Sequence, residues 1–245
     1  MVVEIPRFSN AKNEVNKKSP LNPIVQDSKN GKPRFVADIF PFKGYIWNYG
    51  SLPQTYEDPE VIDKSTGYFG DGDPIDVLEI GSRVATVGEI KQVKVLGVMG
   101  LIDDGETDWK VLAIDVKDPI SERLNTTSDL DSVMPGLINA TRDWLTNYKI
   151  PDGKAQNKWA FEGSLKDSKF TMDIIKEAHM HWLKLTKAQN NPDHQAKFGM
   201  FQNSSDKSEF TKRLESQSSQ SMSQDTSNIS KSEKWFFLSN GKISN

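Results

Sequence analysis

Two short acidic segments contain the residue types best suited to holding a metal ion. The first spans residues 71–76 (Asp-Gly-Asp-Pro-Ile-Asp), and the second spans residues 103–110. Side chains two residues apart on an extended chain point the same way, which pairs Asp71 with Asp73 and Asp108 with Lys110. Carboxylates held together at the edge of a core need a cation, and hard oxygen ligands in this number suit Mg²⁺ or Ca²⁺. We therefore expect a divalent metal site here rather than a solvated acidic loop.

Basic and phenolic residues beside apolar segments extend this candidate site. They are Lys12, Arg34, Lys110, Lys149, Tyr45, Tyr49 and Tyr148. Taken singly, each is typical of a surface charge or a core aromatic residue. Taken together, they fit a multiply anionic substrate that is held between Mg²⁺ and cationic side chains.

The composition of the chain excludes several other chemistries. The 245 residues include no cysteine and three histidines, which rules out disulfides, thiol nucleophiles and cysteine-based metal sites. Thirty-one basic residues stand against 34 acidic ones, so the net charge of −3 does not favour a nucleic-acid or membrane partner. No apolar run is long enough to span a membrane. Without a visible secretory signal, we expect a cytoplasmic protein.

The elements that must position these residues begin with a β-rich region, from residue 1 to about 118. Asp104-Gly105 lies between segments 91–102 and 107–116, which are rich in Val, Ile and Leu, and it therefore predicts a hairpin. Further strands are expected at residues 1–5, 45–49 and 75–80. Short strands with frequent turn signals are typical of a small barrel or sandwich.

Helical spacing follows between residues 119 and 190. Pro135 suits the first turn of a helix, whose apolar stripe runs from Leu137 to Tyr148 and ends before Gly153. A second helix is expected from about residue 167 to 186. We interpret both stripes as core packing.

The last part of the chain changes in composition. Residues 200–232 are rich in Ser, Gln, Lys and Glu, and their few apolar residues predict disorder. Residues 233–238 contain the aromatic run Trp-Phe-Phe, which we expect to act as a C-terminal anchor on the domain or on a partner chain. The organisation is thus a domain over residues 1–190, a disordered segment and an anchor.

Several motifs together resemble the family I soluble inorganic pyrophosphatases. Residues 71–77 fit the family signature, as do residues 44–50, 105–110 and 148–154. Residues 1–7, 21–27 and 234–237 are similar to the eukaryotic branch. The resemblance covers residues 1 to about 188 and the terminal anchor. It makes residues 1–190 the pyrophosphatase catalytic domain.

The resemblance implies a fold, a reaction and an assembly. The fold is α+β, an OB-like five-stranded β-barrel with packed α-helices. The reaction is Mg²⁺-dependent hydrolysis of inorganic pyrophosphate to two phosphates by metal-activated water, and the assembly is a homodimer.

The resemblance also implies roles for individual residues. The metal ligands are Asp71, Asp76, Asp108 and Asp103, with Glu14 acting through water. Asp73 is the base that orients and deprotonates the attacking water, and Tyr45 is the proton donor. The substrate-binding residues are Lys12, Arg34, Tyr49, Lys110, Tyr148 and Lys149, and Glu4 and Glu57 line the same cavity.

Against the eukaryotic pattern, the chain lacks the N-terminal segment and begins at an internal methionine. If a presequence is missing from this chain, the expected location becomes mitochondrial instead of cytoplasmic.

Two other functions compete with hydrolysis of pyrophosphate. Some members of this family also join chromatin-remodelling assemblies, and the Ser-rich tail and apolar terminus suit a non-catalytic scaffold subunit.

A haloacid-dehalogenase phosphatase uses an Asp-x-Asp pair, but it needs alternating β and α units and Thr or Val two places after the second Asp. Ile75 occupies that place here, Asp76 follows it, and the surroundings are β-rich, which disfavours this family.

Overall fold

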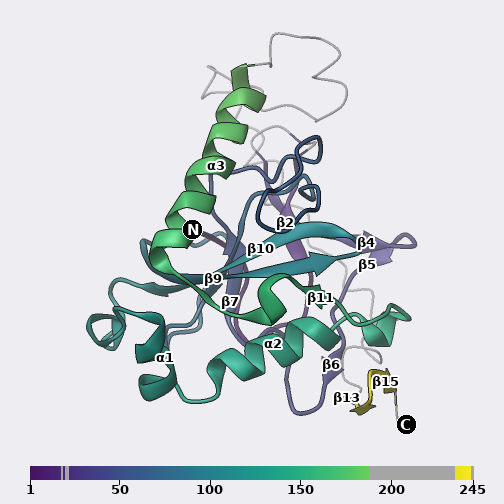
Figure 1. Ribbon diagram of the computed structural model, residues 1–245. Helices are drawn as coiled ribbons and strands as arrows, with labels where there is room; N and C mark the ends of the chain where they lie inside the picture. Colours follow the sequence, from purple (N-terminus) through teal and green to yellow (C-terminus); the bar gives the residue numbers. More distant parts are fainter. Residues whose placement is uncertain (18, 20–21, 188–234, 244–245) are drawn as a thin grey trace, which may run out of the picture.

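The fold is built on a seven-stranded mixed sheet (Figure 1). The computed structural model describes residues 1–17, 19, 22–187 and 235–243. Along the sheet the order is β1 (Val2–Ile5), β7 (Asn48–Ser51), β8 (Asp76–Glu79), β10 (Glu106–Asp115), β9 (Val93–Asp103) and β11 (Lys158–Trp159), and β12 (Lys166–Asp167) also pairs with β9. Neighbouring strands are antiparallel except β8 and β10, which are parallel. This single parallel pair places residues from two distant motifs side by side.

The hairpin between β9 and β10 forms where Asp104-Gly105 predicts it. Both residues have positive φ, 50° and 91°, as two-residue hairpin turns of type I′ require. Nearly every residue in the middle of both strands is buried, because the hairpin lies between two core clusters. The turn therefore holds Asp103 and Asp108 at the edge of the core.

In the described part of the chain, three α-helices pack around the sheet: α1 (Thr127–Val133), α2 (Leu137–Asn147) and α3 (Ser168–Lys187). The two predicted helices, α2 and α3, are confirmed. Pro135, however, lies before α2 and not in its first turn, because Gly136 at φ 86° separates it from the first helical residue. Helix α1 was not predicted, although Thr126 and Asp129 form a capping box at its start.

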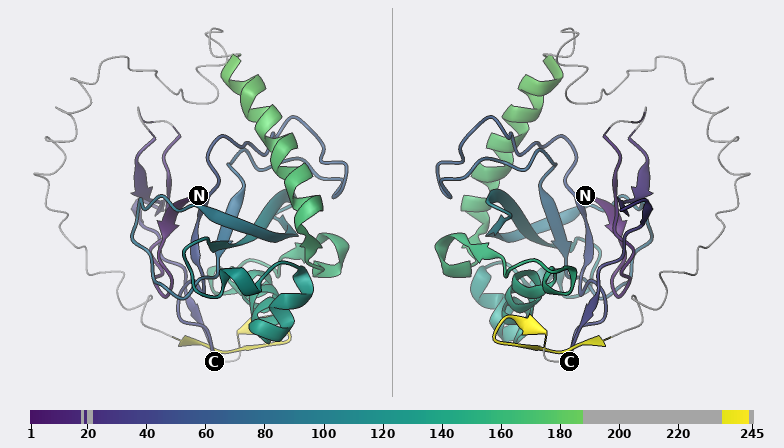
Figure 2. Two further views of the ribbon diagram at one scale, coloured as in Figure 1. Left: turned by 90° about the vertical axis from the view of Figure 1, so that its left-hand side faces the viewer. Right: turned by 90° about the vertical axis from the view of Figure 1, so that its right-hand side faces the viewer.

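Two core clusters fix the helices to the sheet. Helix α2 contributes Trp144, whose ring meets that of Trp47 edge-on at 5.3 Å between centroids. On the other side, Trp109 of β10 packs edge-on against Phe170 of α3, at 5.9 Å between ring centroids. Figure 2 shows α3 on one side of the strands, with α1 and α2 grouped below them.

The remaining strands are short. Strands β2 (Asn13–Val15) and β3 (Ile24–Gln26) form one hairpin, and β4 (Ser28–Lys29) and β5 (Lys32–Pro33) form another. Near the C-terminus, β13 (Trp235–Phe236) pairs in parallel with β6 (Asp38–Ile39), and β14 (Leu238–Ser239) pairs with β15 (Lys242–Ile243). The aromatic run thus lies against the domain, as the yellow segment of Figure 2 shows.

The predicted α+β class is confirmed, while closure of the sheet into a five-stranded barrel stays a prediction. Within the described ranges, no strand pairing joins β1 to β11 or β12. The strand predicted at residues 45–49 begins three residues later, at Asn48, because Tyr45 instead donates its backbone N–H to Ser9. The boundaries of the domain and the anchor stay predictions, and the predicted disordered segment lies outside the described residues. Among the described helices, none combines the length and apolarity needed to cross a membrane.

Candidate active site

One cavity of about 200 Å³ gathers almost all of the predicted site residues. It is lined by the predicted metal ligands, by Asp73 and by all six predicted substrate-binding residues. Glu4 and Ser51 line it as well. Tyr45 does not. The cavity therefore brings together side chains that come from opposite ends of the first 150 residues.

Strands β7, β8 and β10 form one wall. Asp76 of β8 is the register partner of Lys110 in β10, and Asp108 shares a face with Lys110 because strand side chains alternate. The Lys110 ammonium donates to Asp76, to Asp108 Oδ2 at 2.6 Å and to the Tyr49 hydroxyl at 3.2 Å. Although burial alone would lower the pKa of Lys110, Asp108 and Asp76 raise it well above its usual value. Lys110 is thus a fixed positive charge in this wall.

The loop before β8 carries the other two carboxylates of the first motif. Gly72 has φ 79°, so the chain turns there and is not extended as the sequence suggested. Asp71 Oδ1 accepts the backbone N–H of Asp73 at 2.9 Å, which closes the turn. Asp73 is exposed and accepts a hydrogen bond from Lys17, while Asp71 faces inward. The pairing of Asp71 with Asp73 on one extended face was therefore wrong, yet both side chains reach the cavity.

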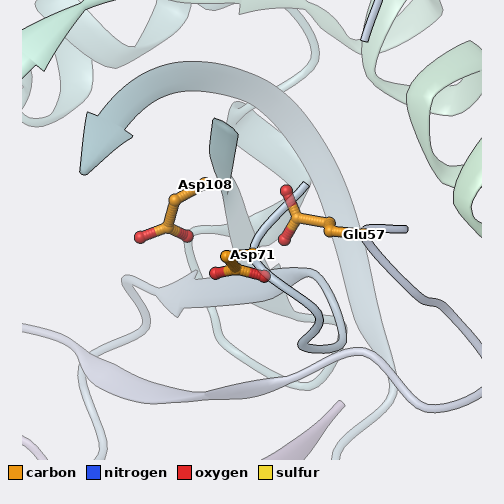
Figure 3. A group of neighbouring side chains, drawn as sticks. All are labelled: Glu57, Asp71 and Asp108. Atoms are coloured by element: carbon orange, nitrogen blue, oxygen red, sulfur yellow. The ribbon is translucent and has the colours of Figure 1, made fainter. Parts of the chain in front are cut away.

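Three acidic side chains from different segments converge beside this wall: Glu57, Asp71 and Asp108 (Figure 3). One oxygen of each lies within 4.8 Å of the others. Glu57 Oε2 and Asp108 Oδ1 are buried and have no hydrogen-bond partner among the described residues. Burial, and then the neighbouring carboxylates, raise the pKa of Asp71 to about 7 and those of Glu57 and Asp108 well above the usual range. Orphaned carboxylate oxygens of this kind fit a hard divalent cation such as Mg²⁺.

Another part of the lining joins the end of β9 to the residues that follow α2. Asp103 accepts hydrogen bonds from Lys149 and, at 3.1 Å, from the Tyr148 hydroxyl. The ring of Tyr148 stacks on Trp144 of α2 at 4.8 Å, which sets its direction. Helix α2 therefore places a cation and a phenol next to the hairpin turn.

The β2–β3 hairpin and its neighbours supply the rest of the lining. Lys12 lies 3.3 Å from Glu14, and Arg34 donates to Asp27 at 2.9 Å. Glu4 is buried and accepts a hydrogen bond from the Ser51 hydroxyl at 3.1 Å. Burial, and then the charge of Asp76, raise the pKa of Glu4 to about 7. Cationic and acidic groups thus lie together in the cavity lining.

Two placements differ from what the motifs alone suggested. Tyr45 is 2% exposed and lies behind the cavity, with its ring 5.1 Å from that of Tyr49. Lys17, which the motifs did not indicate, donates to Asp73 and to the backbone oxygen of Gly72 at 2.8 Å. No local pattern signals this contact, because the partners are 56 residues apart.

Comparison with known proteins places this geometry in a family. The family model for inorganic pyrophosphatase matches residues 1–183. The chain is 57% identical over 185 residues to the inorganic pyrophosphatase of Kluyveromyces lactis, covering 76% of this chain and 64% of that protein. It is 56% identical over 191 residues to that of Homo sapiens, covering 78% and 66%. The chain thus spans just under two thirds of the length of these curated relatives.

Solved structures agree with the sequence comparison. The inorganic pyrophosphatase of Schistosoma japonicum has a TM-score of 0.75 and 55% identity, covering 76% of this chain and 65% of that one. The N-terminally truncated vacuolar soluble pyrophosphatase of Trypanosoma cruzi, solved in complex with PPi, has a TM-score of 0.72 and 45% identity, covering 76% and 69%. Because the family model matches residues 1–183 and these relatives are more than half identical to the chain, the chain belongs to the inorganic pyrophosphatase family.

Proposed function

We propose that this chain hydrolyses inorganic pyrophosphate to two phosphates with Mg²⁺ as its cofactor. The observation that carries the proposal is the single cavity in which carboxylates from three segments face Lys12, Arg34, Lys110 and Lys149. A substrate with several negative charges must have that charge neutralised before another oxygen can attack it. The basic side chains neutralise part of it directly, and the carboxylates do so through the Mg²⁺ that they hold. The related Trypanosoma cruzi structure in complex with PPi supports this choice of substrate.

The proposed cation ligands are Asp71, Asp76, Asp103 and Asp108, with Glu14 acting through water. Bound Mg²⁺ supplies a Lewis acid that polarises the phosphoryl oxygens and lowers the pKa of coordinated water. Of these ligands, Asp76 lies on β8, Asp108 on β10 and Asp103 at the end of β9, so paired strands of the sheet position them. Such positioning matters because preorganised charge costs no reorganisation during the reaction.

The remaining residues orient and stabilise the substrate. Arg34, Lys12, Lys149 and Lys110 neutralise the phosphate oxygens, with hydrogen bonds from the Tyr49 and Tyr148 hydroxyls. Asp73, exposed at the mouth of the cavity, orients the attacking water and takes its proton.

The family resemblance makes Tyr45 the proposed proton donor to the leaving phosphate, although its side chain lies behind the cavity and not in its lining. Burial raises its pKa, against the opposing effect of Lys12, so it keeps its proton at neutral pH.

Phosphate release from pyrophosphate tests the proposal. Purified, folded chain is expected to release phosphate with Mg²⁺ and to lose this activity in EDTA, with recovery when Mg²⁺ is restored. Absence of Mg²⁺-dependent release from protein with a cooperative unfolding transition would refute the proposal.

We also propose that the chain forms a homodimer. Large aromatic side chains at the surface support this, among them Phe8 at 59% exposure and Phe40 at 57%. Aromatic side chains are enriched at protein–protein interfaces. Sedimentation or light scattering would show a mass of twice the chain, and a monomer at micromolar concentration would contradict it.

A cytoplasmic location stays a prediction.

A further inference from the structure

Glu57 is built into the acidic site although it belongs to neither acidic motif. Its backbone N–H donates to the Asp73 carbonyl at 2.8 Å, and its own carbonyl accepts the N–H of Gly72 at 2.8 Å. Two backbone bonds thus fix residue 57 against the turn that carries Asp71 and Asp73. The position of its side chain is set by the same turn that sets theirs.

A third bond fixes the side chain against β10. Glu57 Oε1 accepts the backbone N–H of Trp109 at 2.9 Å, and Trp109 lies between Asp108 and Lys110. This bond orients the carboxylate, so the direction of its second oxygen is determined too. Figure 3 shows the carboxylate of Glu57 turned toward Asp71 and Asp108.

The second oxygen, Oε2, is not explained by a structural role. Glu57 is 5% exposed, and Oε2 has no hydrogen-bond partner in the described part of the chain. Asp108, 6% exposed, leaves its Oδ1 without a partner in the same region. Bridging the loop to β10 requires only Oε1. A buried carboxylate oxygen without a donor is costly, so a ligand for it is expected.

The charges around Glu57 indicate that this ligand is a cation. Among the described residues, no ammonium or guanidinium group lies within 4.0 Å of Glu57 or Asp71, and Lys110 reaches Asp108 and Asp76 instead. One oxygen from each of Glu57, Asp71 and Asp108 lies within 4.8 Å of the others. Divalent cations hold oxygens at about 2.0–2.6 Å, so one cation can touch oxygens separated by up to roughly twice that distance.

We propose that Glu57 is a cation-binding residue, whose Oε2 contributes its oxygen and its charge to a divalent cation held by Asp71 and Asp108. The proposal rests on the proposed function in that it concerns the same cation site. It adds a residue from the loop before the first acidic motif.

Calorimetric titration of the EDTA-stripped chain with Mn²⁺, without substrate, tests this role. Glu57→Gln keeps the shape of the side chain and an oxygen for the Trp109 N–H, and it removes the charge. It is expected to weaken the tightest Mn²⁺ site by about 10- to 100-fold, as loss of residues that support metal sites typically does. Glu60→Gln, an exposed change three residues further along, should bind Mn²⁺ within about twofold of the unchanged chain.

Unchanged Mn²⁺ affinity in folded Glu57→Gln would overturn the proposal. Thermal unfolding in EDTA checks that each variant folds. If Glu57→Gln does not fold, Glu57→Asp keeps the charge but withdraws the oxygens by one methylene, and it too should bind Mn²⁺ more weakly. Folded Glu57→Asp with unchanged affinity would equally overturn the role.

A separate phosphate-release assay distinguishes this proposal from the proposed function. If the unchanged chain releases phosphate and Glu57→Gln binds Mn²⁺ normally, only the role of Glu57 is refuted. If the unchanged chain releases none but Glu57→Gln loses Mn²⁺ affinity, the role of Glu57 stands and the proposed function fails.

Discussion

Asp73 differs from the other carboxylates of the cavity because it is exposed and lies outside the buried acidic group. Its replacement should therefore leave the fold intact. We expect Asp73→Asn to lower kcat by at least about 10²-fold, since the amide can hold a water molecule but cannot take its proton. Steady-state phosphate release at saturating Mg²⁺ measures this. Asp131→Asn, an exposed change in α1, is the control, and a nearly normal rate for Asp73→Asn would remove Asp73 from the role of base.

Glu4 gives the site a pH dependence of stability. Its pKa is raised to about 7 by burial and by Asp76, whereas an unfolded glutamate titrates near 4.5. The folded state binds this proton more tightly, so the contribution of Glu4 is most favourable below about pH 4.5 and is lost as pH rises through about 7. In EDTA, unfolding free energy should fall across that window by at most about 3 kcal/mol from this group.

Glu4→Gln is the test of that assignment, because the amide does not titrate. Chemical denaturation of the unchanged chain and the variant at pH 5, 6 and 7 should give a flatter profile for the variant. Identical slopes for the two proteins would show that another group controls stability in this window.

At the residue level, the sequence predicted which side chains share the cavity but not how each is held. The spacing of Asp71 and Asp73 identified both residues, although the positive φ of Gly72 directs them differently. Lys17 carries no local signal, and Glu57 was expected near the site only through the family resemblance, because the partners of both are reached through tertiary contacts. Tyr45 lies beside the cavity because its ring packs on Trp144, 99 residues away in sequence.

At the level of elements, the two ends of the loop from Glu57 to Gly70 lie so close together that a side chain on Gly70 would not fit between them. A Cβ on Gly70 would lie 2.3 Å from the carbonyl carbon of Glu57, which is backbone and cannot swing aside. We expect Gly70→Ala to lower the unfolding free energy by about 1–3 kcal/mol, as overpacking does, and to weaken Mn²⁺ binding because Glu57 is displaced.

Gly67→Ala in the same loop is the matched control for that change. Gly67 has φ 79° but open space around it, so alanine should cost stability by about 1 kcal/mol without moving Glu57. Denaturant melts and calorimetry on both variants separate the two effects. If both variants bind Mn²⁺ equally well, the close approach at Gly70 does not position the site.

The elements that the sequence predicted are those whose cause is local. The β9–β10 hairpin follows from Asp104-Gly105, and α3 follows from its apolar stripe. By contrast, β11 and β12 are two-residue strands that exist only because β9 offers them a partner. No propensity pattern marks segments of that length, since pairing rather than sequence makes them strands.

At the level of the whole molecule, the C-terminal strand β13 packs on the domain that the N-terminal part of the chain forms. Strand β13 lies beside β6, almost 200 residues earlier in sequence, and Phe40 donates its backbone N–H to Phe236 at 2.9 Å. Phe236 is 8% exposed and belongs to the core cluster that also contains Tyr45 and Trp144. That cluster supports the cavity from behind, so the C-terminal strand contributes to the framework of the site.

Phe236→Ala should therefore destabilise the domain, although the residue lies far from the carboxylates. Loss of a buried phenylalanine typically costs about 3–5 kcal/mol, and we expect the lower end because β13 is short and can partly readjust. Phe237, its neighbour, is 46% exposed and stacks on Phe40 at 5.1 Å between ring centroids, so Phe237→Ala should cost about 1 kcal/mol or less. Denaturant midpoints of the two variants give the comparison directly. Equal losses would mean that β13 does not take part in the core, and that the cavity is supported by the sheet and α2 alone.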